Sequence, residues 1–290
     1  GPDQTICLGE NTAINANSNS GVFFAWNTGA TTQSINVSPN TTTTYSVTVT
    51  DATGCTATDA MTVTVGSTNV ELGPNQTICL GSNTTINATT TNGVFFAWNT
   101  GATTSSINVS PSTTTVYSVT VTDTNGCTAT DNMTVVVGSA DVNAGPDQTI
   151  CLGSNTTINA NSNSGVFFAW NTGATTQSIN VSPNTTTTYS VTVTDATGCT
   201  ATDAMTVTVG STNVELGPNQ TICLGSNTTI NATTTNGVFF AWNTGATTSS
   251  ITVSPSTTTV YSVTVTDTNG CTATDNMTVV VGSADVNAGP

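Results

Sequence analysis

The sequence predicts an all-β chain built from four tandem antiparallel β-sandwich domains. Three observations predict this fold: an internal repeat of 72 residues, apolar residues that alternate with polar ones, and turn residues between the alternating segments. No segment shows the spacing of an amphipathic helix. Many short strands separated by closely spaced turns are typical of a β-sandwich.

The dipeptide Gly-Pro marks the repeat, because it begins each copy. The predicted domains are 1–72, 73–144, 145–216 and 217–290, the last with the start of a further repeat at residue 289. The first and third repeats (type A) are nearly identical, as are the second and fourth (type B), so the larger unit is a pair of domains, 144 residues long. A repeat of this length can hold its own core, and we expect the chain to be a window from a longer array.

The strands follow from the alternation within one repeat. In the first repeat we expect about seven strands, at 3–8, 12–16, 22–27, 32–37, 45–51, 55–58 and 60–65. The fifth shows the pattern best, since Tyr45, Val47 and Val49 alternate with Ser and Thr. Such a strand buries one face, and threonine keeps the other face β-branched and soluble. Segments such as "NTGATT", "SPNTTTT" and "DATG" supply the turns.

The aromatic residues recur once per repeat. Trp26 on the third predicted strand is the expected core anchor, with Phe24 and Tyr45 beside it. The equivalent core anchors are Trp26, Trp98, Trp170 and Trp242. The alternative role is a platform for stacking sugar rings, and Phe23 is the candidate because alternation places it opposite Phe24.

Eight cysteines at fixed spacing predict disulfides and an oxidising compartment. They are Cys7, Cys55, Cys79, Cys127, Cys151, Cys199, Cys223 and Cys271. A thiolate metal site is disfavoured, because the cysteines are not clustered and the chain has no histidine. We expect Cys7 to pair with Cys55, so that each repeat folds as a complete unit. The alternative is a bond between neighbouring repeats, such as Cys55 with Cys79.

The charge composition excludes several functions. The chain has 15 acidic residues and no Lys, Arg or His, which gives a net charge of -15. Nucleic-acid binding through phosphate neutralisation and attraction to anionic membranes both need basic residues. No apolar run is long enough to insert in a membrane. An enzyme is not expected, because the usual general bases and the partner of a cysteine nucleophile are missing.

Carboxylates are the remaining candidates for catalytic or metal-binding groups. Asp51 and Asp59 recur in every repeat, and a carboxylate pair can in principle hydrolyse glycosides. We instead expect Asp51 to cap a turn and Asp59 to be a solvated strand residue. Calcium is the one cofactor considered, with Glu71 and Asp141 near the joints, but no calcium-binding loop motif occurs.

One resemblance rests on "GPDQTICLG" and on "FFAWNTGATTQSINVSPNTTTTYSVTVTDATGCTATDAMTVTV". These segments resemble the Ig-like and PKD-like repeats of very large surface proteins of gliding Bacteroidota, and the resemblance covers all four repeats. A PKD repeat would read closer to WDFGDG at "WNTGAT", which is a departure. The resemblance implies type 9 secretion, an extracellular location on the cell surface, and a role in adhesion, gliding or the hook-like appendages of predatory relatives.

The two repeat types differ mostly at predicted loops and outward positions. Type B repeats add valines where alternation predicts solvent: Val116, Val136, Val260 and Val280. We expect these to lie at or near contacts between chains, the alternative being drift after duplication. The predicted function is a structural, disulfide-locked stalk or filament that assembles with itself. The alternative is an array of carbohydrate-binding modules that adheres to prey or surface glycans. An ice-binding threonine face is disfavoured, because a twisted sandwich offers no long flat surface.

Overall fold

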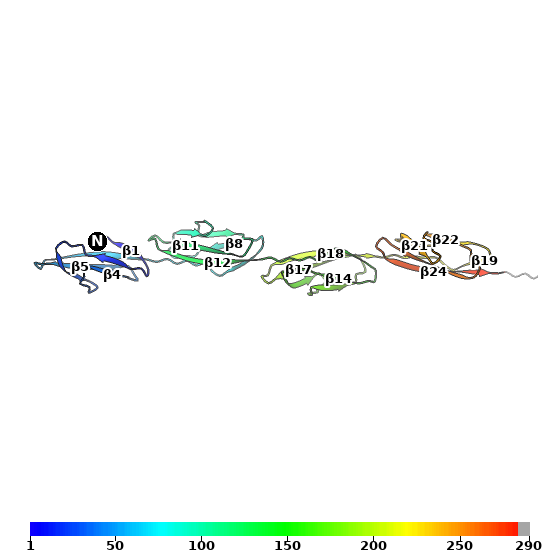
Figure 1. Cartoon of the computed structure of the whole chain (residues 1–290), viewed down its shortest axis with the longest axis horizontal. Coiled ribbons are helices and arrows are strands. Elements are labelled where there is room, and N and C mark those ends of the chain that lie inside the picture. The colour runs from blue at the N-terminus through cyan, green and yellow to red at the C-terminus, as the bar shows by residue number, and fades with distance from the viewer. Residues whose placement is uncertain (284–290) are drawn as a thin grey trace, which may run out of the picture. The chain divides into compact units, whose positions relative to one another are not determined.

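The computed structural model describes residues 1–283, and strands are the only regular elements among them. Each repeat forms its own pair of sheets (Figure 1). The protein is therefore an all-β array of four tandem Ig-like sandwich domains, as the sequence predicts. No helix in the described part of the chain is long and apolar enough to cross a membrane.

Within residues 1–283, every repeat contains six strands in the same order. The first repeat has β1 (Gln4–Cys7), β2 (Thr12–Asn15), β3 (Gly21–Trp26), β4 (Ser34–Val37), β5 (Thr43–Asp51) and β6 (Thr56–Gly66). The second has β7 (Gln76–Cys79), β8 (Thr84–Asn87), β9 (Phe95–Trp98), β10 (Ser106–Val109), β11 (Thr115–Thr122) and β12 (Thr128–Gly138). The third has β13 (Gln148–Cys151), β14 (Thr156–Asn159), β15 (Gly165–Trp170), β16 (Ser178–Val181), β17 (Thr187–Asp195) and β18 (Thr200–Gly210). The fourth has β19 (Gln220–Cys223), β20 (Thr228–Asn231), β21 (Phe239–Trp242), β22 (Ser250–Val253), β23 (Thr259–Thr266) and β24 (Thr272–Gly282).

Two sheets make up each sandwich. In the first repeat the larger sheet has the order β1-β6-β5-β3, and the smaller one pairs β2 with β4. The hairpin of β5 and β6 is antiparallel, but β1 runs parallel to β6. The expectation of a purely antiparallel sandwich is wrong for this pair. No hairpin joins β1 to β6, and β1 lies at the sheet edge, so its direction is set by packing and not by a turn.

The predicted number of strands is also corrected. The segments expected at 55–58 and 60–65 form one strand, β6, which pairs without a break along β5 from Thr43↔Val63 to Thr50↔Thr56. Asp59 does not interrupt the strand, because it stands opposite Val47 in the ladder with its own backbone groups paired. In the part of the chain that the structure describes, each repeat therefore has six strands and not seven.

The chain divides into two compact units, Gly1–Gly138 and Ser139–Pro290, each containing two repeats. Within each repeat the tryptophan is buried in the core cluster, as Trp26 is beside Tyr45 and Met61. The four tryptophans Trp26, Trp98, Trp170 and Trp242 are all buried.

The segment before a repeat contributes to the core of that repeat. Val70 and Leu72, which precede the second repeat, belong to the core cluster of Trp98. Between them, Glu71 forms an antiparallel bridge to Thr89, just beyond β8. The connecting segment is therefore an extra edge element of the following sandwich and not a free linker.

Truncation of Leu72 tests this packing. We expect Leu72→Ala to destabilise the Gly1–Gly138 unit by about 2–4 kcal/mol, because it leaves a cavity at a buried core position. Urea unfolding followed by tryptophan fluorescence measures the change. The control is Val116→Ala, whose side chain is 53% exposed and whose loss should cost no more than about 0.5 kcal/mol. Equal effects of the two substitutions would contradict the role of Leu72 in the core.

Candidate functional site: the joints between repeats

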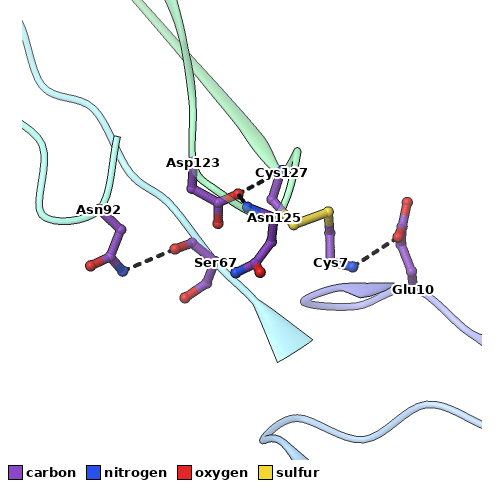
Figure 2. The surroundings of a disulfide bond; sticks show 7 residues. All are labelled: Cys7, Glu10, Ser67, Asn92, Asp123, Asn125 and Cys127. Carbon is purple, nitrogen blue, oxygen red and sulfur yellow. Dashed lines mark hydrogen bonds between the residues drawn. A yellow bond between two sulfur atoms is a disulfide. The ribbon is translucent and has the colours of Figure 1, made fainter. Parts of the chain in front are cut away.

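A disulfide crosses the joint between successive repeats. Cys7, at the end of β1, is bonded to Cys127 in the turn between β11 and β12 of the second repeat, with Cα atoms 5.5 Å apart (Figure 2). Cys151 of the third repeat is bonded in the same way to Cys271 of the fourth. In both bonds the cysteine of the first strand joins the turn cysteine of the next repeat.

The predicted bond between Cys7 and Cys55 is wrong, and the fold gives the reason. Cys7 pairs with Gly66 at the end of β6, whereas Cys55 directly precedes the start of β6 at Thr56. An 11-residue strand separates these ends by about 30 Å. A disulfide requires Cα atoms within about 7 Å, so the two cysteines lie at opposite ends of the sandwich and cannot bond.

The remaining cysteines fall into two groups. Cys79 and Cys199 are also disulfide-bonded. Cys55 and Cys223 carry free, exposed thiols in the structure. The alternative bond of Cys55 with Cys79 is therefore not formed either.

The turn that carries Cys127 is held by a carboxylate. The Oδ1 atom of Asp123 accepts hydrogen bonds from the N–H groups of Asn125 and Cys127, both at 2.8 Å (Figure 2). Gly126 has a φ of 86°, in the left-handed region where glycine is favoured. The turn cap expected for Asp51 is confirmed, because Asp51 accepts the same bonds from Thr53 and Cys55. This caps a turn and positions a cysteine, and it is not a catalytic arrangement.

Glycine at the end of β6 allows the next repeat to approach. A Cβ atom on Gly66 would lie 2.7 Å from the Sγ of Cys127 and 2.9 Å from the Cβ of Asn125. The equivalent Gly210 meets Cys271 at 2.8 Å. Real Cβ atoms do not come so close to other heavy atoms, so any side chain at these positions would push the joint apart.

A second carboxylate in each of the last three repeats holds the connecting segment that precedes that repeat. The Oδ2 atom of Asp131 accepts the backbone N–H of Leu72 at 2.8 Å, and Asp203 and Asp275 accept those of Ala144 and Leu216 at the same distance. These aspartates are equivalent to Asp59, for which the sequence suggested only a solvated role. The recurrence of this aspartate in every repeat was a signal that it has a role. The residues around it in the strand do not indicate that its partner lies 59 positions away.

The two joint types use different polar contacts. Before the second repeat, the side-chain oxygen of Asn69 accepts hydrogen bonds from the N–H and hydroxyl of Thr91. Before the third repeat, the carboxylate of Asp141 accepts bonds from Asn163 and Ser164. The hydroxyl of Ser164, followed by the N–H of Asn163, lowers the pKa of Asp141 below its ordinary value of 3.8. In both joints, a polar side chain of the connecting segment therefore accepts hydrogen bonds from a loop of the repeat that follows it.

This difference predicts a pH dependence confined to one joint. Because the folded-state pKa of Asp141 is depressed, its stabilising contribution is present above the ordinary value of 3.8 and is lost as the pH falls through the lower folded-state pKa. In an NMR titration, the amide signals of Asn163 and Ser164 should shift in this acid range, while that of Thr91, bonded to neutral Asn69, stays fixed. Asp141→Asn should abolish the shift, and its persistence in that variant would contradict the assignment.

No metal centre accounts for these acids in the described part of the chain, where no three potential ligands of the His, Cys, Asp and Glu type gather. The two calcium candidates have other surroundings. The Asp141 oxygens are occupied by hydrogen-bond donors, and the backbone of Glu71 pairs with Thr89.

The remaining candidate residues lie on the surface. Val116 and Val260 are 53% exposed, Val280 is 38% exposed and Val136 is half-buried, so none is enclosed in its own core. Phe23 is 70% exposed on the outer face of the larger sheet, opposite Thr50. Its equivalents Phe95, Phe167 and Phe239 are exposed to nearly the same extent.

Comparison with known proteins finds similarity of structure but not of sequence. No protein-family model matches the chain, and no curated protein matches it either. Among solved structures, the chain is similar to the N-terminal eight Ig domains of Down Syndrome Cell Adhesion Molecule, with 12% identity and a TM-score of 0.30, over 97% of this chain and 46% of that one. It is also similar to Sidekick-1 immunoglobulin domains 1–4, with 13% identity and a TM-score of 0.31, over 97% of both chains. Three domains of the Highly Immunogenic Outer Capsid protein of bacteriophage RB49 match 76% of this chain over 100% of theirs, with 14% identity and a TM-score of 0.41.

The fold and the joints together define a class of protein. It is a tandem array of Ig-like domains in which the two repeats of each compact unit are joined by a disulfide. Disulfides persist in oxidising environments, which agrees with a protein outside the reducing cytosol.

Proposed function

We propose that this protein is a structural component of an extracellular stalk or filament and has no enzymatic role. The observation that carries the proposal is the disulfide from Cys7 to Cys127, which ties one repeat to the next. A joint that is bonded covalently, packed by Leu72 and closed around Gly66 resists bending and extension. Such joints suit a part that transmits force. The sequence resemblance to type 9-secreted repeats directs the proposal to a surface appendage of a gliding or predatory bacterium.

Lateral assembly with further copies is part of this proposal. The half-exposed valines that distinguish type B repeats supply apolar surface that a lone domain does not need. A variant in which Val116, Val136, Val260 and Val280 are all replaced by Thr tests the contact. Thr stands at the equivalent positions of the type A repeats, so folding should be preserved. Electron microscopy of the concentrated protein should show multi-stranded filaments that the variant cannot form. Single chains at all concentrations would exclude lateral assembly.

An array of carbohydrate-binding modules is the second candidate. It is favoured by one exposed phenylalanine per repeat on an open sheet face, since aromatic rings can stack on sugar rings. A glycan array probed with the protein and with a variant carrying Ser at Phe23, Phe95, Phe167 and Phe239 decides the question. Binding that is lost in the variant would support adhesion, and absence of any bound glycan would remove this candidate.

A further inference from the structure

The two cross-repeat disulfides connect the first strand of one repeat with the last strand of the next. Cys151 ends β13 and is bonded to Cys271, which directly precedes β24. Cys7 ends β1 and is bonded to Cys127, which directly precedes β12 (Figure 2). Each bond therefore completes a covalent route from the start of a compact unit to its end, and this route leaves out the segment between the two cysteines.

The covalent route through each bond is short. In the Ser139–Pro290 unit it contains 13 residues before the bond, 139–151, and 13 described residues after it, 271–283. A fully stretched chain spans at most about 3.6 Å per residue, so residues 139 and 283 can lie no more than about 100 Å apart while the bond is intact. The segment that the bond leaves out spans 120 positions, and stretched it would add about 400 Å.

Most of this route is already extended in the folded protein. In the Ser139–Pro290 unit, β13 contributes four residues and β24 contributes eleven. A strand rises about 3.2–3.4 Å per residue, which is close to the limit of a stretched chain. Tension favours unfolding in proportion to the length that unfolding releases. Tension along β24 therefore does little to favour its separation from the sheet, because the strand can hardly lengthen.

The strand that follows the bond is also held on both sides. β24 lies inside the larger sheet of its repeat, in the order β19-β24-β23-β21. It pairs along the whole of β23, Thr259–Thr266, and along the whole of β19, Gln220–Cys223. The ladder hydrogen bonds of an antiparallel pair run perpendicular to the strands, so a pull along β24 would have to break them together and not one after another. In the Gly1–Gly138 unit, β12 has the same place in its sheet.

The point where the route crosses from one repeat to the next is rigid. Cys271 is buried, and the Oδ1 atom of Asp267 accepts its N–H at 2.8 Å and that of Asn269 at 2.9 Å. A Cβ atom on Gly210, at the end of β18, would lie 2.8 Å from the Sγ of Cys271, so the bond is packed against the preceding repeat. The capped turn and the close packing leave the bond little freedom to yield.

The segment that the bond leaves out carries exposed apolar surface. Phe167 on β15, Phe239 on β21 and Val260 on β23 are all exposed. All three lie in the sequence between Cys151 and Cys271. These side chains, considered above for contacts with sugars or with further copies, therefore lie outside the covalent route.

We propose that each two-repeat unit is a tension bypass: a pull along the chain passes through the first strand, the disulfide and the last strand, while the segment between the cysteines stays folded and bears no load. The unit thereby keeps its length and the shape of its exposed surface under tension. Without the bond, the same pull would act on the strands of both repeats in turn. The proposal deepens the structural role proposed above and rests on it for the source of the tension.

Optical tweezers applied to the full chain test the bypass. Handles are attached through azide-bearing residues in place of Ser139 and Ser283, which are exposed and flank the two repeats of the second unit. With its disulfides intact, the protein should show no unfolding step, and the two attachment points should stay within about 100 Å of each other. A Cys151→Ser, Cys271→Ser variant should unfold in steps and lengthen by about 400 Å more.

The matched control is a Cys7→Ser, Cys127→Ser variant, which makes the same changes outside the handles and should behave like the protein with intact disulfides. An equal lengthening of both variants, or none in the Cys151→Ser, Cys271→Ser variant, would overturn the proposal. Filament formation is tested separately by electron microscopy. A lack of filaments would leave the tweezers result unchanged, so failure of the structural role and failure of the bypass are distinguishable.

Reduction under tension distinguishes a bypassed segment that is folded from one that has already unfolded, and it does not depend on the folding of a cysteine variant. Dithiothreitol converts the Cys151–Cys271 disulfide to two thiols as it forms its own cyclic disulfide. If the segment is still folded, the lengthening of about 400 Å should follow reduction as separate unfolding steps, one per repeat. A single jump of the full length at the moment of reduction would mean that the segment had already unfolded, and it would overturn the proposal.

Discussion

Removal of the disulfide between Cys7 and Cys127 should have the largest effect on the stability of the Gly1–Gly138 unit. The bond closes a loop of 120 positions, and in the chain-entropy model a loop of that length stabilises the folded state by about 5 kcal/mol. For a unit of this size we expect the thermal midpoint of a Cys7→Ser, Cys127→Ser variant to fall by roughly 10–20 °C. The bond also couples the two repeats, so a single transition should separate into two.

Differential scanning calorimetry measures both effects. Cys55→Ser is the matched control, because it removes a thiol that is free in the structure and should leave the transition unchanged. If the double variant kept one transition at the original temperature, the bond would contribute nothing to the joint. The same measurement under reducing conditions should reproduce the behaviour of the variant.

Substitution of Gly66 by Ala should also destabilise the Gly1–Gly138 unit, and it acts through the joint alone. The glycine lies at the end of β6, in strand backbone that alanine adopts readily, so the cost arises from the added Cβ. That atom would lie 2.7 Å from the Sγ of Cys127, and relief of such overpacking costs about 1–3 kcal/mol.

Gly282→Ala is the control offered by the chain itself. It makes the same change at the equivalent position of the fourth repeat, where the added atom meets nothing closer than 4.0 Å. Denaturant unfolding should show a loss of stability for Gly66→Ala and none for Gly282→Ala. A similar loss in both would mean that glycine is needed by the strand and not by the neighbouring repeat.

Much of the fold follows from local patterns in the sequence. Alternation of Tyr45, Val47 and Val49 with polar residues identifies a strand and its buried face, because successive side chains of a strand point to opposite sides. The Asx turn at Asp51 is equally local, since its donors lie within four residues. The missed features are those that local patterns do not encode, such as the parallel pairing of β1 with β6 and the uninterrupted length of β6.

The joints between repeats show most clearly which features the sequence does not predict. The sequence alone determined the 72-residue repeat, the pairing of A and B types, the strand faces, the buried tryptophans and the lack of basic groups. Which cysteines bond was decided only by the tertiary structure, because it depends on which end of the sandwich each strand reaches. Cys7 and Cys55 lie on opposite ends of one domain, while Cys7 and Cys127 meet across a joint whose closeness depends on Gly66. The sequence favoured the bond of Cys7 with Cys55 because each repeat would then fold as a complete unit, but a disulfide forms where Cα atoms approach in space.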